Sequence, residues 1–391
     1  MADETSLQTS PAAQNQKLPL RRMITAAVLA ASNIAAAVVL VSVVLFGSGS
    51  QSGAARVEAK DAAIMDKYDM FMTNRISDAL EGVMAVEKVF WLSDRDLVAP
   101  EPDPACYGQV TSPAELQWLL EEAADLIDGQ EMLFGANTPI WIGEPIYYYH
   151  DETILVITWK EARDGSMFTF SEVKIAHPSQ FRRFLADGKF GAEKQYTTTE
   201  MAASVNAVVA SSGDFYKFRQ FGAIVYDNTL QRFDGSSVDT CFIDENGDLH
   251  FAYRNDLKTR EEAEQFVSDN RIRFSLAFGP VLVDNGEVHL TYNYGLGDIN
   301  EFYSRAALCQ MDDLHYLVVN SCGEGGYVQG QTINSFARII GELGVEKAYA
   351  LDGGQTTVIA MNDEMISNVD FGTQRQISDI IYFATALPEG D

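Results

Sequence analysis

One uncharged stretch near the start of the chain most limits how the protein can fold. Residues 23–46 carry no charged side chain and consist mainly of Ala, Val, Leu and Ile. About 20 apolar residues cross the hydrocarbon layer of a membrane, whereas the apolar core of a cleaved signal peptide has about 7 to 15. The stretch therefore predicts a transmembrane signal-anchor helix. A processed signal sequence is the alternative, because the small residues 47–54 could be cut, and in both cases the rest of the chain is exported.

The charges beside this stretch predict its orientation. Lys17, Arg21 and Arg22 precede it, and residues 47–55 carry no charge. Basic residues stay on the cytoplasmic side of a membrane. We therefore expect residues 1–22 in the cytoplasm, a single pass through the cell membrane at 23–46, and the C-terminal domain outside the cytoplasm. A bacterial envelope protein fits this topology.

The charge balance argues against a general nucleic-acid binder. The chain of 391 residues has 28 Lys and Arg against 56 Asp and Glu, a formal net charge of −28. Binding to phosphate backbones depends on Lys and Arg that release counterions. We expect no nucleic-acid partner, although a local cationic pocket for one phosphate is compatible with a negative net charge.

The exported part divides into two regions. Residues 47–142 are predicted to be a helical, membrane-proximal stalk. A helical stripe runs over 56–91, a proline-bearing linker covers 98–109, and a second helix begins at the Ser112 N-cap.

Residues 143–391 are predicted to form the second region, an α+β (mixed α/β) domain, because short runs rich in Val, Ile, Tyr and Thr alternate with helical patterns. The expected strands include 146–149, 153–159, 167–175 and 221–226, and the expected helices 179–185, 199–209, 259–269 and 332–343.

The segment that bears most on chemistry follows a predicted buried strand at 347–351. Asp352, Gly353 and Gly354 come directly after it, and Thr356 and Thr357 add hydroxyl groups. A carboxylate beside two glycines lets backbone N–H groups approach a ligand closely. An ordinary tight turn, in which the Asp caps its own backbone, is the alternative.

Other polar groups stand at the ends of predicted strands. Ser212, Gly213 and Asp214 follow a small apolar run, and Asn320 follows another, with a turn as the alternative for the first group. Arg305 and Arg375 are candidates for phosphate binding, because the planar guanidinium donates two parallel hydrogen bonds, and solvated surface arginines are the alternative. The histidines are isolated from one another, so we expect neither a metal site nor another cofactor.

Taken together, these segments resemble the phosphodiester glycosidase family, which includes N-acetylglucosamine-1-phosphodiester α-N-acetylglucosaminidase (the uncovering enzyme) and bacterial members related to exopolysaccharide biosynthesis. The resemblance covers roughly residues 150 to 386. It rests on the order of motifs similar to N-G-D-F-Y, F-G-P, R-T-A-I-G, H-Y-L-V-V, N-L-D-G-G-G-S and R-x-x-S-D-I-I-Y-F, which stand here at 212–216, 278–280, 305–309, 315–319, 350–356 and 375–383.

The resemblance implies a hydrolase that cleaves the glycosidic C–O bond beside the phosphate of a sugar-1-phosphodiester, in envelope or extracellular polysaccharide metabolism. It implies Asp352 as the first catalytic candidate and Asp214 as the second. Substrate or phosphate binding would fall to Arg305, Arg375, Gly353, Gly354, Thr356, Thr357, Ser212, Gly213 and Asn320.

Several matched positions depart from the family pattern. Ser212 stands for an Asn, residues 320–322 for an Asp-Gly-Arg type segment, Ala350 for an Asn, and Gln355 for a third Gly. A catalytically degenerate protein that binds glycans on the same scaffold is therefore the rival hypothesis. The expected partners are a carbohydrate phosphodiester or glycan and the membrane, and the sequence contains no basis for an oligomeric state.

Overall fold

The computed structural model describes residues 98–134, 145–235, 237–295, 299–323 and 330–386, which all fall in one compact unit, Ala79–Asp391. The predicted cytoplasmic tail, the predicted membrane span at 23–46 and the first half of the predicted stalk lie outside these residues. Within the described ranges, no helix is long and apolar enough to cross a membrane.

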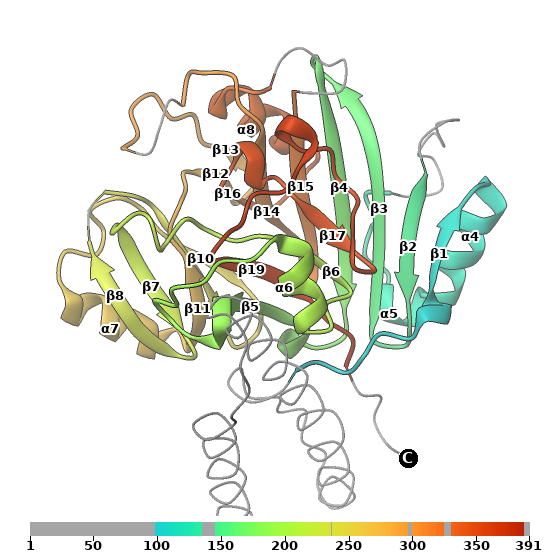
Figure 1. Cartoon of the computed structure of the whole chain (residues 1–391), viewed down its shortest axis with the longest axis horizontal. Helices are drawn as coiled ribbons and strands as arrows, with labels where there is room; N and C mark the ends of the chain where they lie inside the picture. The colour runs from blue at the N-terminus through green and yellow to red at the C-terminus, as the bar shows by residue number, and fades with distance from the viewer. Residues whose placement is uncertain (1–97, 135–144, 236, 296–298, 324–329, 387–391) are drawn as a thin grey trace, which may run out of the picture. The chain divides into compact units, whose positions relative to one another are not determined.

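A nine-stranded antiparallel sheet forms the largest layer of the domain (Figure 1). Its strands are, in spatial order, β1 (Tyr107–Val110), β2 (Ile146–His150), β3 (Ile154–Arg163), β4 (Ser166–Ile175), β15 (His315–Cys322), β14 (Arg305–Asp312), β16 (Lys347–Leu351), β12 (Val281–Asp284) and β13 (Glu287–Val288).

Three smaller antiparallel sheets complete the strands. A five-stranded sheet has the order β18 (Glu364–Met365), β17 (Ile359–Met361), β6 (Val209–Ser212), β19 (Asp379–Phe383) and β5 (Phe181–Leu185). A three-stranded sheet has the order β10 (Leu249–Ala252), β9 (Thr240–Asp244) and β11 (Ile272–Leu276), and β7 (Gly222–Tyr226) pairs with β8 (Thr229–Asp234).

The helices are few and short. The described α-helices are α4 (Pro113–Glu122), α5 (Ala124–Ile127), α6 (Thr198–Ser204), α7 (Arg260–Asp269) and α8 (Ile333–Gly341). Single 3₁₀ turns are η2 (Pro104–Cys106), η3 (Pro178–Gln180), η4 (Ala186–Gly188), η5 (Gly354–Thr356) and η6 (Asp370–Gly372). The domain is a mixed α/β fold made mostly of strands, in agreement with the predicted class.

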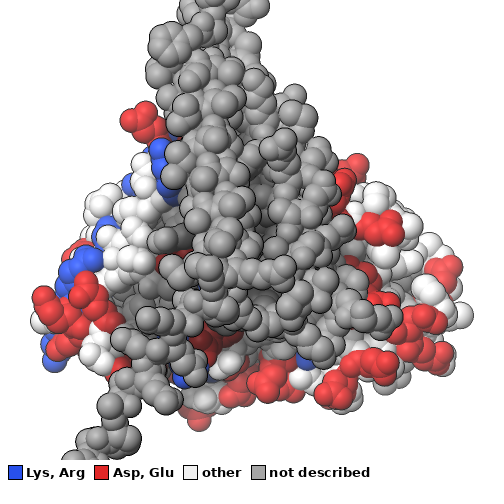
Figure 2. All heavy atoms as spheres, turned by 90° about the horizontal axis from the view of Figure 1, so that it is seen from below, with Lys and Arg blue, Asp and Glu red and all other residues white. Residues whose placement is uncertain are grey.

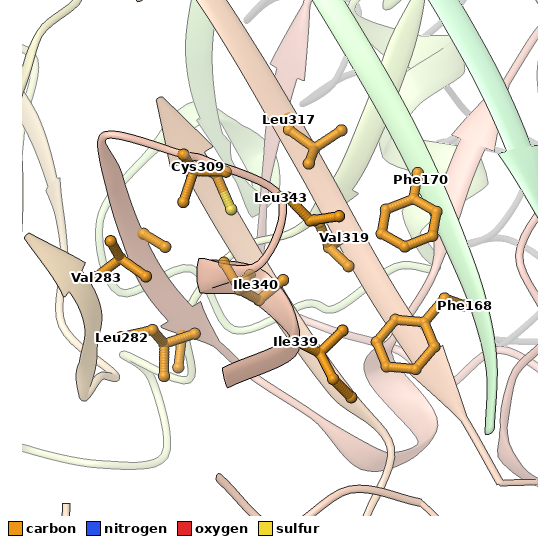
Figure 3. Close-up of a cluster of buried hydrophobic side chains, with 14 of the residues drawn as sticks. Phe168, Phe170, Leu282, Val283, Cys309, Leu317, Val319, Ile339, Ile340 and Leu343 are labelled. Carbon is orange, nitrogen blue, oxygen red and sulfur yellow. The ribbon is translucent and has the colours of Figure 1, made fainter. Parts of the chain in front are cut away.

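Helix α8 covers one face of the nine-stranded sheet. The Thr332 hydroxyl caps its first turn, and an apolar stripe faces the strands. Figure 3 shows this cluster, in which Ile339, Ile340 and Leu343 lie opposite Phe168 and Phe170 of β4 and Leu317 and Val319 of β15.

The opposite face of the same sheet packs on the smaller sheets. The period of two along β14 shows how: Ala307 and Cys309 join the cluster under α8, whereas Ala306 and Leu308 join the cluster between the sheets. That second cluster contains three aromatic rings with centroids 4.7 to 5.3 Å apart, from Phe181, Tyr316 and Phe383. Helices α6 and α7 cover separate apolar clusters.

The structure corrects the predicted linker and part of the predicted stalk. Residues 107–110, expected to lie in a linker, form edge strand β1 and pair with β2. The helix expected after Ser112 is confirmed, since the Ser112 hydroxyl accepts a hydrogen bond of 3.3 Å from the Glu115 N–H. The helix packs into the main apolar cluster through Leu116 and Leu119. The described part of the predicted stalk, residues 98–134, therefore belongs to the folded domain.

The helix predicted at 179–185 is wrong. Residues 181–185 form β5, which pairs with β19, and a 3₁₀ turn precedes it. The apolar residues Phe181, Phe184 and Leu185 have helical spacing, but the segment pairs with β19, and Arg183 forms buried ion pairs with Asp214 and Asp379. The helix predicted at 199–209 ends earlier, at Ser204. Val209, the last residue of the predicted helix, is the first residue of β6.

The surface agrees with the acidic composition. Figure 2 shows Asp and Glu side chains spread along the visible rim of the domain, with Lys and Arg in smaller groups.

Candidate active site

The Asp352 loop lies where the two largest sheets meet. Strand β16 of the nine-stranded sheet ends at Leu351, and strand β6 of the five-stranded sheet ends at Ser212. The Asp352 N–H donates a hydrogen bond of 3.3 Å to the carbonyl oxygen of Gly213. The structure therefore brings together two of the segments that the sequence predicted as parts of one site.

Burial changes the acidity of Asp352. The residue is half-buried, and this desolvation raises the pKa of its carboxyl group to about 6. The neighbouring Thr356 hydroxyl and the charges of Arg375 and Arg219 act in the opposite direction. A carboxyl group with a pKa near neutrality, reachable from solvent and close to two arginines, has the properties expected of a catalytic group.

The two arginines near Asp352 share one aromatic ring. The guanidinium carbons of Arg219 and Arg375 lie 5.5 and 5.3 Å from the centre of the Phe215 ring. Arg219 also lies 5.6 Å from the ring centre of Phe278, and the Phe215 ring stacks on Phe218 at 4.6 Å. Aromatic faces hold guanidinium groups through cation–π attraction while leaving their N–H donors available at the edge.

Arg219 was missed by the sequence analysis. It comes from the loop that begins with Gly213 and Asp214, five positions after the latter, and it alternates with aromatic residues. That spacing was the available signal. Arg375, in contrast, was predicted, and its charge does act on Asp352.

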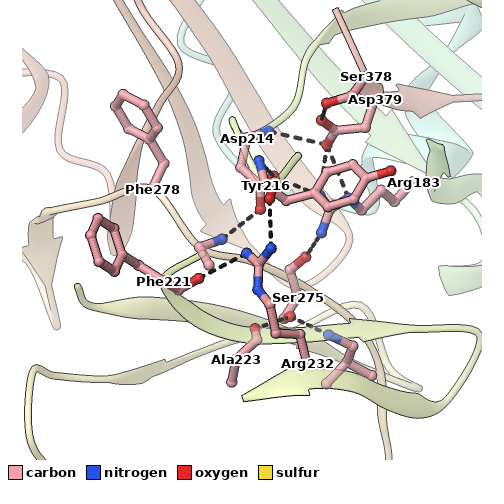
Figure 4. Close-up of polar contacts among 12 residues, drawn as sticks. Arg183, Asp214, Tyr216, Phe221, Ala223, Arg232, Ser275, Phe278, Ser378 and Asp379 are labelled. Atoms are coloured by element: carbon pink, nitrogen blue, oxygen red, sulfur yellow. Dashed lines mark hydrogen bonds and ion pairs between the residues drawn. The ribbon is translucent and has the colours of Figure 1, made fainter. Parts of the chain in front are cut away.

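Asp214, the second predicted catalytic residue, is a buried anchor. Figure 4 shows it in a network with Arg183 and Asp379. One terminal nitrogen of Arg183, Nη2, lies 2.8 Å from Oδ1 of Asp214 and 2.8 Å from Oδ2 of Asp379, and all three side chains are shielded from solvent. Burial raises the pKa of Asp379 to about 7.

The remaining hydrogen bonds of Asp214 hold the protein backbone. Its oxygens accept from the N–H groups of Tyr216 at 2.8 Å and of Ala277 at 2.7 Å. These bonds connect the loop after β6 to the end of β11, which is followed by Phe278. Asp214 therefore positions the loops on which Phe215, Arg219 and Phe278 stand, and its carboxylate does not face the solvent.

The glycines and threonines after Asp352 mainly stabilise their own loop. The Gly354 N–H donates to the Ser304 carbonyl at 2.8 Å, and the residue has a φ of +68°. A Cβ at Gly353 would lie 2.6 Å from the same carbonyl oxygen. Thr356 and Thr357 each donate to a glycine carbonyl at 2.9 Å. The Gly354 N–H is therefore already bound within the protein, and its role in ligand binding stays a prediction.

Arg305 is placed differently from the other predicted phosphate ligand. Its Nε and Nη2 atoms donate to the backbone carbonyls of Gln331 and Glu301, each at 2.9 Å. Burial lowers the pKa of its guanidinium to about 10, and its charge is not among the main influences on Asp352. Arg305 thus holds the segment before α8 against β14.

Ser212 and Asn320 are buried. Each is about 1% exposed, and the side-chain oxygens of both and the amide nitrogen of Asn320 have no hydrogen-bond partner in the described part of the chain. Asn320 is beside Ala306 and Thr169 in the sheet, and Ala306 points into the layer between the sheets. Both predicted ligand residues therefore lie beneath the surface of the site. Gly213 is buried as well, and a Cβ there would meet the Asp379 carboxylate at 2.0 Å.

A metal centre has no obvious place in the described ranges. They contain no group of three or more His, Cys, Asp or Glu side chains arranged to hold an ion.

A comparison with protein families supports the reading of these loops. Residues 205–384 match the family model described as phosphodiester glycosidase, a span that includes β6, the Arg219 loop, Asp352 and Arg375. This part of the chain is similar to the phosphodiester glycosidase family. The family resemblance predicted from the motifs is confirmed.

A curated protein is also similar to part of this chain. The SPbeta prophage-derived uncharacterized protein YomE of Bacillus subtilis is 24% identical over 208 residues, which is 52% of this chain and 31% of that protein. The chain thus matches about a third of the length of this relative.

Two solved structures are similar to the domain. The catalytic domain of zebrafish N-acetylglucosamine-1-phosphodiester α-N-acetylglucosaminidase, auto-inhibited by its pro-peptide, is 16% identical with a TM-score of 0.48. The match covers 64% of this chain and 85% of the zebrafish chain. A hypothetical protein from Synechocystis is 16% identical with a TM-score of 0.42 and covers 63% of this chain and 64% of its own.

Proposed function

We propose that the domain hydrolyses a sugar-1-phosphodiester by breaking the bond between the anomeric carbon and the phosphate oxygen. The observation that carries this proposal is Asp352, a half-buried carboxylate whose pKa is lowered by the charges of Arg219 and Arg375, in a domain that matches the phosphodiester glycosidase family model. One anionic group and two cationic groups are what this reaction requires, because the substrate carries a phosphate and its transition state resembles an oxocarbenium ion.

The two arginines bind the phosphate in this mechanism. Both guanidinium groups contact the Phe215 ring, and their charges neutralise the charge of the leaving group. A phosphate oxygen leaves readily as an anion, so the reaction needs no strong general acid.

Asp352 then acts as a carboxylate. It stabilises the positive charge that develops on the sugar ring, or directs a water molecule to the anomeric carbon. The two arginines support this role, since their charges favour the ionised form and oppose the effect of burial.

The predicted membrane helix completes the proposal. A domain anchored by residues 23–46 and placed outside the cytoplasm would act on envelope or extracellular polysaccharides. The support for this location is the uncharged stretch and the basic residues before it.

Glycan binding without turnover is the second candidate function. It is favoured by the departures at Ser212, Asn320 and Ala350, where the family pattern has Asn, Asp and Asn. The burial of all three side chains weakens this argument, because buried positions can change with little effect on the surface of the site.

The deciding experiment is an assay of the purified full chain, in detergent, on a panel of sugar-1-phosphodiesters. We expect release of free sugar, and its loss in Asp352→Asn. Asp269→Asn, at the exposed end of α7, serves as the matched control. If the parent protein releases no sugar from any substrate but binds one in calorimetry, the non-catalytic function replaces the enzyme.

A further inference from the structure

A groove lined by tyrosines lies away from Asp352, at the edge where the two largest sheets approach each other. It has a volume of about 240 Å³ and is formed by β1 and β2 on one side and the β17–β18 hairpin on the other. The residues that matter here are Tyr107, Gln109, Tyr147, Met361, Asn362 and Glu364. We call this site the tyrosine groove.

The tyrosine groove is separate from the candidate active site. Strand β17 runs from Ile359, which pairs with Ser211 near the active site, to Met361, which pairs with Val209. Thr357 and the Asp352 loop precede this strand, whereas Asn362 and the groove follow it. A ligand in the groove would therefore not contact Asp352.

Two of the four tyrosines on β1 and β2 already have hydroxyl partners. Tyr107 donates to the Val208 carbonyl at 3.4 Å, and Tyr149 donates to the Asp151 carboxylate at 2.8 Å. Among the described residues, the hydroxyl groups of Tyr147 and Tyr148 make no recorded hydrogen bond, although both rings are only half-exposed. A half-buried tyrosine with a spare hydroxyl offers an apolar ring face and a polar edge to one ligand.

Tyr148 also has a packing role. Its ring covers Gly108, where a Cβ would lie 2.4 Å from the ring, and the two residues are cross-strand neighbours. This contact explains why Tyr148 is present. It does not explain Tyr147, which points to the opposite face of β2, so the inference depends mainly on Tyr147.

The polar side chains of the groove define the kind of ligand. Gln109, Asn362 and Glu364 are exposed and supply amide donors and acceptors and a carboxylate. The described residues that line the groove include no Lys or Arg, and Glu364 makes it acidic. A phosphate or other anion is disfavoured there, while hydroxyl groups can both donate to and accept from these side chains.

We infer that the tyrosine groove is a second carbohydrate site, which binds a neutral sugar ring of a glycan chain. The ring would stack on Tyr147 and exchange hydrogen bonds with Gln109, Asn362 and Glu364. The volume is below the roughly 300 to 1,000 Å³ of cavities for drug-sized ligands, and it suits a single ring. The inference does not depend on the proposed catalytic activity.

Calorimetric titration of the full chain in detergent tests the site. The probes are maltohexaose, cellohexaose and chitohexaose, with hexagalacturonate as the anionic probe. We expect saturable binding of at least one neutral probe, and weaker binding of hexagalacturonate. We expect Tyr147→Ala and Gln109→Ala to weaken the affinity about tenfold each.

Two variants separate the groove from other surfaces. Asp352→Asn should leave the affinity for the neutral probe unchanged, and so should Tyr292→Ala, which removes a tyrosine that is 74% exposed elsewhere. Gln109 is exposed, and its side chain makes no hydrogen bond with the described residues, so its variant tests the site even if Tyr147→Ala does not fold.

Three results would overturn the inference. The first is no saturable binding of any neutral probe, and the second is unchanged affinity in Gln109→Ala. The third is tighter binding of hexagalacturonate than of every neutral probe, which would assign the groove to anions.

Discussion

The backbone N–H of Asp352 donates a hydrogen bond of 3.3 Å to the carbonyl oxygen of Gly213. This bond joins the end of β16 to the end of β6, and so joins the two largest sheets at one point. The two loops that follow these strands supply Asp352 on one side and Phe215 and Arg219 on the other. The candidate active site is therefore a product of how the sheets meet.

Replacing the central carboxylate should remove activity and stabilise the fold at neutral pH. We expect Asp352→Asn to lower the rate of sugar release by about 10²- to 10⁴-fold. Because burial raises the pKa of this group to about 6, the folded state favours its protonated form. The protonated Asp352 side chain therefore stabilises the folded state below a pH of about 4. This stabilisation is lost as the pH rises through 6.

Thermal unfolding of the same variant checks the second half of this prediction. At pH 7.5, Asp352→Asn should unfold at a higher temperature than the parent, by a free energy of about 1 kcal/mol after allowance for solvent screening. At pH 4 the two proteins should be alike. A variant that is less stable at both pH values would assign Asp352 a purely structural role.

The dependence of activity on pH should follow the ionisation of Asp352. Since the phosphate leaves without a proton, we expect kcat/KM to rise with pH and to level off above a pH of about 6 to 7. Initial rates on one sugar-1-phosphodiester between pH 4.5 and 8.5 measure this. A rate that falls through this range would mean that Asp352 donates a proton.

Neutralising either arginine on the Phe215 ring should weaken substrate binding and shift this profile. Arg219→Gln and Arg375→Gln each remove a charge that lowers the pKa of Asp352, so the rising limb should move to higher pH. KM should increase about 10- to 100-fold, because a charge-assisted hydrogen bond to phosphate is lost.

Arg254→Gln is the control for the arginine variants. Arg254 also lies on an aromatic ring, 4.9 Å from the centre of Tyr294, but it is not among the charges that act on Asp352. It should change neither KM nor the pH profile. Equal effects of all three variants would show that loss of ring packing, and not loss of the phosphate ligand, explains the result.

Removing the buried arginine should unfold the domain more easily. Arg183→Met leaves the carboxylates of Asp214 and Asp379 in the interior without their shared cation. We expect a loss of about 3 to 5 kcal/mol in the free energy of unfolding, measured in urea at pH 7. Arg163→Met, which breaks a half-exposed pair with Glu161, should cost about 1 kcal/mol or less.

Arg305 should behave as a structural residue. Arg305→Gln removes donors to the carbonyls of Gln331 and Glu301, so we expect lower stability with KM changed by less than about threefold. Thermal unfolding and initial rates on the same preparation distinguish the two effects. An increase in KM as large as that of Arg375→Gln would restore Arg305 as a phosphate ligand.

The sequence alone determined the features that depend on neighbouring residues. The cap at Thr332 and the apolar stripe after it predicted α8, and the apolar run at 347–351 predicted β16. The motif order indicated the family, and Asp352 and Arg375 were among the predicted site residues. These signals are readable because helix and strand periodicity, capping and short motifs are local properties of the chain.

The role of each charged group, in contrast, follows from contacts in the folded protein. Asp214 and Asp352 both follow strands and precede turns, yet one is paired with Arg183 in the interior and the other remains half-exposed. Residues 181–185 became a strand for the same reason, and Arg219 reached the site through a loop held by Asp214. Burial and ion pairing depend on residues distant in the sequence, and here they follow from the packing of one sheet on another.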